Sequence, residues 1–405
     1  MLSSLIACIA IIVLFEFTHR AFEKYTAWLA ALFLAFAPTF LWESVAILSS
    51  TLFLALYLAV LLALLQSRYR LAAFLALLAA LTRYEGVVLI ALMFLLLFVR
   101  DVRERKLNRA DWLICGAFAF AFPLTLMATG ALATGNALQF LGTNSMAAIW
   151  LRFLAPGDFL KRAAFFITRY PDVTPVAYLG IAGAISALLW HRNRVVGLLA
   201  LTTTLYLLFF ETLVWLNYTT LEVRFLMYPG LPLIVFAAFA LAWLFGKIWR
   251  LSKVLGWATL LLVVVTICYF GYRDGNRGMQ FVYNSQSSMR EMAEELAQFI
   301  PPRQPTNVLA YGGTAGALDF FARQRGIELS FTEFRYAPDD NPEQYIVAHK
   351  IRYVIYPVGN AFAKAKYPYL ARFETQTCGA VTFTALTQFA TTPDNQMYSI
   401  WSVTY

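Results

Sequence analysis

Six residues in the apolar first part of the chain carry groups that could take part in chemistry. They fall into three motifs: Glu43 alone, Arg83-Tyr84-Glu85, and Glu222 with Arg224. A planar guanidinium such as that of Arg224 donates paired hydrogen bonds and therefore suits a phosphate group. Ionisable side chains are costly in an apolar environment of this kind, so each is a candidate for a functional site.

Each motif also has a purely structural interpretation. Glu43 can be a water-exposed carboxylate in a loop between two helices. Arg83 and Glu85 can form an internal ion pair that lets the chain turn within the protein. Arg224 can be an arginine that extends to the membrane surface and anchors a helix end. The sequence leaves these alternatives open.

Other motifs indicate little chemistry. The Gly312-Gly313 turn lacks the spacing of a dinucleotide fingerprint and the lysine of a P-loop, so it predicts a tight strand-to-helix connection. The three histidines, His19, His191 and His349, are too scattered to predict a metal site. No cofactor is therefore predicted, although the sequence leaves a requirement for a divalent metal open.

The composition predicts that membrane helices position the charged motifs. The chain has 405 residues, of which 60% are hydrophobic and only 14% charged, more apolar side chain than one ordinary core can hold. Apolar blocks fill residues 1–272, whereas 273–405 has the composition of a water-soluble domain. We therefore predict a polytopic helical membrane domain followed by an α/β domain.

The net charge of +9 does not indicate nucleic-acid binding, because the basic residues lie in short clusters between apolar blocks.

About ten apolar segments are predicted, and the shorter ones must be tilted or partial crossings because a span needs about 20 residues. They lie near 2–16, 25–41, 44–65, 71–82, 86–99, 111–131, 175–190, 195–215, 225–246 and 254–272.

Basic residues gather in every second connection between these segments. This set comprises Arg20 and Lys24; Arg68 and Arg70; Arg100, Arg103, Arg105, Lys106 and Arg109; Arg192 and Arg194; and Lys247, Arg250 and Lys253. It holds 14 Lys and Arg residues, against six in the alternate connections. The positive-inside rule then places this set in the cytoplasm, and the three charged motifs, both chain ends and the C-terminal domain outside it.

The longest external connection, 132–174, mixes aromatic residues such as Trp150 and Phe166 with basic ones such as Arg152 and Arg162. This mixture favours an interfacial helix at the level of the lipid headgroups, and an ordinary solvated loop is the alternative.

In the C-terminal domain the pattern alternates between helix and strand. A capping box at 288–291 predicts the start of a helix, and Gly326 the end of the next one near Arg325. Strands are predicted at 307–311 and 352–356, and in the alternating runs 381–389 and 397–403.

The order of the charged motifs resembles the GT-C class of membrane glycosyltransferases. The residues that carry the resemblance are Ala37-Pro38 to Glu43 before a long apolar helix, Ala79-Ala80-Leu81-Thr82-Arg83-Tyr84-Glu85-Gly86, and Glu222-Val223-Arg224-Phe225 followed by Pro229 and Pro232. The relatives are bacterial proteins similar to protein O-mannosyltransferases and lipid A aminoarabinose transferases. The resemblance covers nearly the whole chain, and the order of the motifs carries it more than any single one.

Enzymes of this class pass a sugar from a polyprenyl-phosphate carrier to an acceptor hydroxyl at the outer membrane face. The resemblance implies displacement at the anomeric carbon, in which a carboxylate withdraws the acceptor proton and cations stabilise the departing lipid phosphate. It assigns the donor phosphate to Arg224 and Arg83, and sugar or acceptor contacts to Glu43, Glu85, Tyr84 and Glu222. It further implies a bacterial inner-membrane protein and a lipid, glycan or protein acceptor. From its external placement, we expect the C-terminal domain to help to select the acceptor.

The chain departs from the class at its beginning. The class has a first helix and a first external loop whose Asp is the general base, whereas the first segment here matches the second helix of the class. The topology agrees, because an external N-terminus at Met1 is unusual for a chain with no preceding signal. We therefore expect either a short form that is inactive as written, or a protein whose start lies upstream of Met1.

Two other classes of function stay open. A transporter or flippase of lipid-linked intermediates needs a polar path across the membrane, whereas the charged motifs here are predicted at one face. A non-catalytic assembly subunit is the third hypothesis, and the missing Asp keeps it open.

Overall fold

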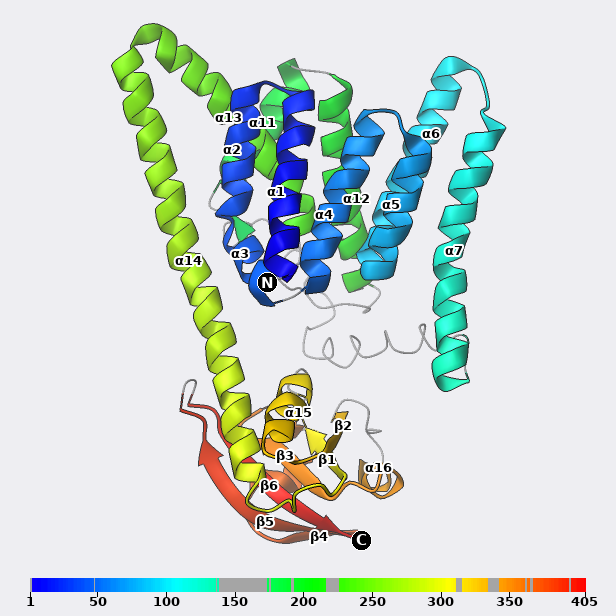
Figure 1. The fold of residues 1–405 in the computed structure, drawn as a ribbon, viewed down its shortest axis with the longest axis vertical. Helices are drawn as coiled ribbons and strands as arrows, with labels where there is room; N and C mark the ends of the chain where they lie inside the picture. The colour runs from blue at the N-terminus through cyan, green and yellow to red at the C-terminus, as the bar shows by residue number, and fades with distance from the viewer. Residues whose placement is uncertain are drawn as a thin grey trace. The chain divides into compact units, whose positions relative to one another are not determined.

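The computed structural model describes residues 2–46, 48–135, 137, 173–174, 176–190, 193–215, 226–310, 315–333, 342–360, 363–364, 367–392 and 395–405. The chain divides into two compact units, Met1–Gly278 and Met279–Tyr405, which we call the helical unit and the C-terminal unit (Figure 1). Helix α14 (Lys253–Leu296) belongs to both, so the predicted domain boundary at residue 273 falls within a continuous helix.

Apolar helices build the helical unit, because inside a bilayer the backbone must satisfy its own hydrogen bonds. Those described before α14 are α1 (Leu2–Ala21), α2 (Lys24–Ala35), α3 (Pro38–Ala46), α4 (Leu48–Leu65), α5 (Tyr69–Thr82), the 3₁₀ turn η1 (Tyr84–Gly86), α6 (Val87–Glu104), α7 (Arg109–Thr134), α11 (Ala177–Trp190), α12 (Arg194–Trp215) and α13 (Met227–Leu251).

The predicted apolar segments are helical, but the break predicted between 41 and 44 is wrong, because α3 runs through it from Pro38 to Ala46. The segment predicted at 25–41 is split into α2 and α3 at Phe36 and Ala37. Pro38 explains the break, because proline disfavours helical geometry in the residue before it and is itself well suited to the first turn of a new helix.

Five helices among the described residues are long and apolar enough to cross a membrane, namely α1, α7, α12, α13 and the first part of α14. The shorter apolar helices include α2, α5 and most of α4 and α11. The protein is therefore an integral membrane protein. Shorter helices of this kind can lie within such a bundle because neighbouring helices bury them.

Successive helices of the helical unit alternate in direction, so their connections gather at two ends (Figure 1). The α1–α2, α4–α5, α6–α7 and α13–α14 connections and the start of α12 lie at one end, which we call the basic end. Helix α3 and the α5–α6 turn lie at the opposite end. The structure thus brings the predicted basic clusters together, while the side of the membrane to which they belong stays a prediction.

Helices α11 and α13 pack with their backbones close together. A Cβ atom on Gly180 would lie 2.4 Å from the carbonyl oxygen of Leu233, and one on Gly183 would lie 2.3 Å from that of Phe236. Small residues three apart allow this approach, as in other membrane helix pairs. The contact fixes the start of α13, which contributes to the charged site described below.

The C-terminal unit contains a six-stranded mixed sheet in the order β2-β1-β3-β6-β5-β4. The strands are β1 (Thr306–Ala310), β2 (Leu329–Glu333), β3 (Tyr353–Pro357), β4 (Gln376–Cys378), β5 (Val381–Ala390) and β6 (Met397–Thr404). Strand β1 pairs in parallel with β2 and β3, and the remaining pairs are antiparallel. Helices α15 (Ala315–Gln324) and α16 (Pro342–Ala348) connect the parallel strands, as parallel pairing requires.

The α/β character of this unit is confirmed, but one predicted feature is wrong. Ser288 and Glu291 do not open a helix, because α14 continues through them to Leu296. The Ser288 hydroxyl donates to the carbonyl oxygen of Asn284 within the helix, and Glu291 instead accepts a bond from the backbone N–H of Thr392. The predicted interfacial segment 132–174 lies almost wholly outside the described residues.

Candidate functional site

The turn between α5 and α6 forms the centre of the candidate site. Helix α5 ends at Thr82 because Arg83 has extended backbone angles (φ −151°, ψ 139°). Gly86 then allows the chain to fold back tightly, since a Cβ atom there would lie 2.3 Å from the backbone nitrogen of Ala80. The turn therefore packs directly on the last residues of α5 and holds Arg83 at the end of the helical unit.

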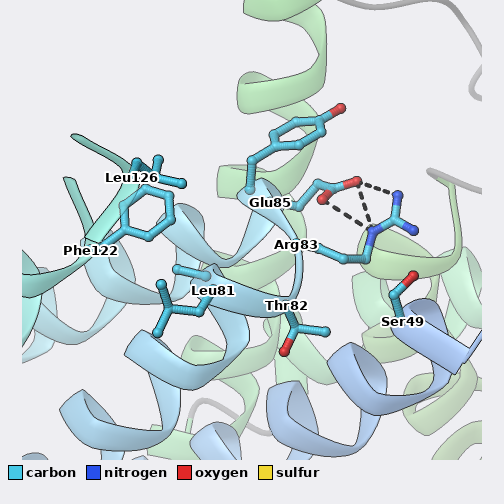
Figure 2. A pocket seen from close by; sticks show the side chains of 9 residues that line it. Ser49, Leu81, Thr82, Arg83, Glu85, Phe122 and Leu126 are labelled. Atoms are coloured by element: carbon cyan, nitrogen blue, oxygen red, sulfur yellow. Dashed lines mark hydrogen bonds and ion pairs between the residues drawn. The ribbon is translucent and has the colours of Figure 1, made fainter. Parts of the chain in front are cut away.

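Arg83 is held by a buried carboxylate and a buried hydroxyl. Its Nη2 donates to Oε1 of Glu85 at 2.8 Å, and its Nε donates to Oε2 at 3.2 Å (Figure 2). Its Nη1 donates to the hydroxyl of Ser50 at 2.7 Å. The side chain of Glu85 is 0% exposed and that of Arg83 is 12% exposed. The ion pair expected from the sequence as one alternative is thus present, and it fixes the guanidinium.

Glu43 adds a second carboxylate to this region. It lies on α3, is 2% exposed, and interacts electrostatically with Arg83 and Tyr228. The Thr51 hydroxyl donates to its backbone carbonyl at 3.1 Å, which ties α3 to α4. Glu43 is therefore not a water-exposed loop residue, and its charge adds to that of Glu85 in the neighbourhood of Arg83.

Aromatic rings from three helices pack beneath the charges. Tyr228 of α13 lies with its ring 5.9 Å from the guanidinium carbon of Arg83, a distance suited to cation–π attraction. Its ring contacts Phe53 edge-on with the centroids 4.8 Å apart, and the hydroxyl of Tyr57 donates to its carbonyl. The hydroxyl of Tyr206 is buried, interacts electrostatically with Glu85, and has no hydrogen-bond partner among the described residues. The charged groups thus rest on an interior surface that excludes water.

A cavity of about 340 Å³ adjoins Arg83 and Glu85 (Figure 2). Its lining residues are Ser49, Ala80, Leu81, Thr82, Arg83, Tyr84, Glu85, Phe122 and Leu126. Phe122 and Leu126 come from α7, so one wall is apolar whereas the α5–α6 turn is charged (Figure 2). The cavity can therefore take a molecule that has an apolar part and an anionic or hydroxyl-bearing part.

The structure brings only some of the predicted site residues together. Arg83, Glu85 and Glu43 form one cluster, and Tyr84 is exposed at the cavity with its ring centroid 6.4 Å from that of Phe209. Glu222 and Arg224 lie outside the described residues.

The prediction missed Ser50, Tyr228 and the α7 wall. Ser50 belongs to a polar triplet, Ser49-Ser50-Thr51, within an otherwise apolar stretch, and that triplet was a signal that could have indicated it. No local pattern indicates Phe122 or Leu126, because the fold alone brings α7 beside the turn. Among the described residues no group of three His, Cys, Asp or Glu side chains could hold a metal ion.

Comparisons with solved structures identify the fold. ArnT from Cupriavidus metallidurans in the apo state matches with 14% identity, covering 99% of this chain and 82% of that chain, with a TM-score of 0.50. The same protein bound to undecaprenyl phosphate matches with 13% identity, coverages of 99% and 83%, and a TM-score of 0.49. The oligosaccharyltransferase of Archaeoglobus fulgidus in the apo form matches with 13% identity and a TM-score of 0.48, covering 87% of this chain.

The chain spans only 57% of the length of that archaeal oligosaccharyltransferase. No protein-family model and no curated protein matches the sequence. The likeness to apo ArnT nevertheless confirms, at the level of the fold, the architecture that the GT-C resemblance implied.

Proposed function

Because the chain has a fold similar to that of ArnT, we propose that it is a GT-C glycosyltransferase that uses a lipid-linked sugar. The proposed reaction transfers a sugar from a polyprenyl-phosphate carrier to a hydroxyl of a lipid, glycan or protein. We propose the bacterial inner membrane as its location, with the Arg83 end and the C-terminal unit outside the cytoplasm. The observation that supports this function most directly is a fixed guanidinium beside a cavity with an apolar wall.

Such a cavity matches the two-part chemistry of a polyprenyl phosphate. The phosphate is anionic and accepts the paired hydrogen bonds of a guanidinium, whereas the polyprenyl chain is apolar and suits Phe122 and Leu126 on α7. Little of α7 is buried over its apolar stretch, so lipid can reach this helix. ArnT from Cupriavidus metallidurans itself has been crystallised with undecaprenyl phosphate.

The charges of the cluster indicate why a second cation is needed. With Glu43 and Glu85 both ionised, Arg83 leaves the cluster with a net negative charge, which disfavours a phosphate nearby. We assign the second positive charge to Arg224 and expect both arginines to bind the donor phosphate. The carboxylates of Glu43 and Glu85, together with Tyr84 and Glu222, are then assigned to the sugar and the acceptor, whose hydroxyls they can bind as hydrogen-bond acceptors.

The proposal is tested by following transfer in membranes that contain the full chain. Radiolabelled sugar is supplied on a polyprenyl phosphate, and its appearance in lipid, glycan and protein fractions is measured. Arg83→Gln is expected to reduce transfer by about a hundredfold or more, because the departing phosphate loses a fixed donor. Arg83→Lys keeps the charge but not the planar fork, and an intermediate loss is expected.

Arg103→Gln is the matched control, since it removes one exposed arginine at the basic end. Size-exclusion profiles in detergent show whether each variant is folded. Binding of the polyprenyl phosphate is measured in parallel, because binding does not need a general base. Folded Arg83→Gln protein that binds and transfers as well as Arg103→Gln would contradict the proposal. Movement of the labelled lipid across vesicles without any bond change would favour a flippase instead.

A further inference from the structure

The connection between α13 and α14 exposes an unusual combination of side chains at the basic end. It joins two helices that are both long and apolar enough to cross a membrane, with Ser252 in an extended conformation between them. Leu251 is 83% exposed and Val254 is 80% exposed, and Trp257 is exposed beside them. Because the adjoining helices are membrane spans, these side chains lie where acyl chains meet the lipid headgroups.

The same connection carries three basic side chains in a stretch of sequence without acidic residues. Lys247, Arg250 and Lys253 are all exposed, and the sequence contains no Asp or Glu between Glu222 and Asp274. Within the part of the chain that the structure describes, none of these three basic side chains has an acidic partner.

The other connections at the basic end differ in this respect. Arg20 is paired with Glu16, Arg70 and Arg100 are paired with Asp111, and Arg194 donates to the hydroxyls of Ser67 and Tyr69. The α6–α7 connection also contains Glu104 among its basic residues. The α6–α7 connection, like the α13–α14 connection, has exposed apolar side chains, Val102 and Leu107, but only the latter of these two connections combines them with basic residues and no acidic residue at all.

Aromatic rings organise the basic side chains. The ammonium of Lys247 lies 4.0 Å from the ring centroid of Trp243, a cation–π contact that holds it beside the helix. Trp249 and Trp257 pack edge to face across the turn, with centroids 5.1 Å apart. Gly256 permits this packing, because a Cβ there would lie 2.6 Å from the indole of Trp249. The connection thus presents exposed tryptophans and cations side by side, a combination typical of the membrane interface.

We propose that the α13–α14 connection is a binding site for acidic phospholipids. In this site Lys247, Arg250 and Lys253 contact the phosphate and the anionic headgroup, and Leu251, Val254 and Trp257 contact the acyl chains. A lipid is the fitting partner because a soluble anion would leave these exposed apolar side chains without cover. The proposal concerns the end of the helical unit opposite Arg83 and does not depend on the sugar-transfer reaction.

The test compares lipids bound to the purified full chain in nanodiscs of phosphatidylcholine with rising fractions of phosphatidylglycerol. Native mass spectrometry after release counts the retained lipids of each kind. Wild-type protein is expected to retain phosphatidylglycerol preferentially. Each Lys or Arg replaced by Gln is expected to weaken this preference about fivefold, in line with the attraction of one basic residue to an anionic membrane surface.

The triple variant Lys247→Gln, Arg250→Gln, Lys253→Gln is compared with Arg103→Gln, Arg105→Gln, Lys106→Gln, which removes the same charge from another connection at the basic end. Lys247→Arg with Lys253→Arg keeps the charges and is expected to retain the lipid even if Gln variants are poorly folded. Equal loss in the two Gln triple variants would overturn the proposal. So would equal retention of phosphatidylcholine, or displacement of the lipid by millimolar inorganic phosphate, which would indicate a simple anion site.

Discussion

The two ends of the helical unit use buried charge in different ways. At the basic end, Arg100 donates to Asp101 at 2.7 Å and to Asp111 at 2.8 Å, and Arg70 also donates to Asp111 at 2.8 Å. Among the described residues of the opposite end, Arg83 pairs with Glu85 and interacts electrostatically with Glu43. The first group balances two arginines against two aspartates, whereas the second has more acid than base.

The two aspartates of the basic end accept hydrogen bonds on both of their oxygens. Both oxygens of Asp101 are bonded, one by Arg100 and the other by the Trp112 indole and the Asn108 backbone. Both oxygens of Asp111 are bonded as well, to Arg70 on one side and to Arg100 and Asn108 on the other. A network satisfied in this way joins α5, α6 and α7 and has no need of a ligand. The Arg83 cluster instead adjoins a cavity of about 340 Å³, and from this difference we infer that one end is structural and the other functional.

The largest expected effect comes from a variant that removes the charges of the Arg83 cluster and keeps the volume of its side chains. It tests whether this cluster serves binding, unlike the network at the basic end. We expect Arg83→Met with Glu85→Leu, made in a Glu43→Gln background, to lower the affinity for polyprenyl phosphate by about a hundredfold or more. Its free energy of unfolding should stay within about 1 kcal/mol of the Glu43→Gln protein, since apolar residues of similar size often replace buried ion pairs without loss. Lipid binding and detergent unfolding are measured on the same preparations.

Two outcomes of that experiment would count against a functional role for the cluster. Unchanged affinity would show that the lipid phosphate does not need Arg83. A loss of several kcal/mol of stability with little change in binding would show that Arg83 and Glu85 serve the fold, as Arg100 and Asp111 do.

The converse experiment removes the shared carboxylate, Asp111, from the network at the basic end. Asp111→Ala leaves two arginines without their shared carboxylate, and we expect it to lower the free energy of unfolding by about 3 kcal/mol. Asp319→Ala is the matched control, because Asp319 pairs with Arg323 on an exposed helix face, where such a pair contributes only about 0.3–0.5 kcal/mol. The folded fraction of Asp111→Ala should bind polyprenyl phosphate normally. Equal destabilisation by both variants would remove the distinction between network and surface pair.

Hydropathy was sufficient to predict the helices that position both ends, because in a membrane chain the apolar segments must become helices. The pairing of Arg83 with Glu85 could also be predicted from the sequence, because side chains on the same turn can contact each other. Ser50 and Tyr228 were not, because packing of α4, α5 and α13 brings them to Arg83 from far along the chain. The network at the basic end was missed for the same reason. Its arginines were counted only for topology, and the role of Asp111 depends on α7 lying beside α5 and α6.

The C-terminal unit shows a second limit of sequence patterns. Its longer strands β5 and β6 alternate clearly and were predicted, as were the five-residue strands β1 and β3. Strands β2 and β4 were not predicted, and β4 has only three residues, too few to show a period. The capping box was misleading because Ser288 satisfies its hydroxyl within α14. For Glu222 and Arg224, the assigned roles stay predictions that only the transfer and binding experiments address.

The smallest expected effect concerns a hydroxyl beneath the Arg83 cluster. Tyr206 is fully buried, and its hydroxyl has no hydrogen-bond partner among the described residues. Removing an unsatisfied buried polar group should not cost stability, so Tyr206→Phe is expected to stabilise the protein by up to about 1 kcal/mol. Tyr57→Phe is the matched control: it removes a hydroxyl that donates to the Tyr228 carbonyl at 3.2 Å, and it should destabilise by about 1 kcal/mol.

Thermal unfolding in detergent measures the stability of both tyrosine variants. Binding of polyprenyl phosphate tests whether the Tyr206 hydroxyl contributes to the bound state. If Arg83 turns toward a bound phosphate, Glu85 loses some of the hydrogen bonds that it accepts from Arg83. The nearby Tyr206 hydroxyl can then donate a hydrogen bond to the Glu85 carboxylate. Tyr206→Phe should then raise stability but weaken binding about threefold to tenfold, which corresponds to the energy of about one ordinary hydrogen bond. The basic end has no counterpart, because its carboxylates already have their donors. A Tyr206→Phe protein that binds normally would show that Glu85 keeps its bond to Arg83 when the lipid is present.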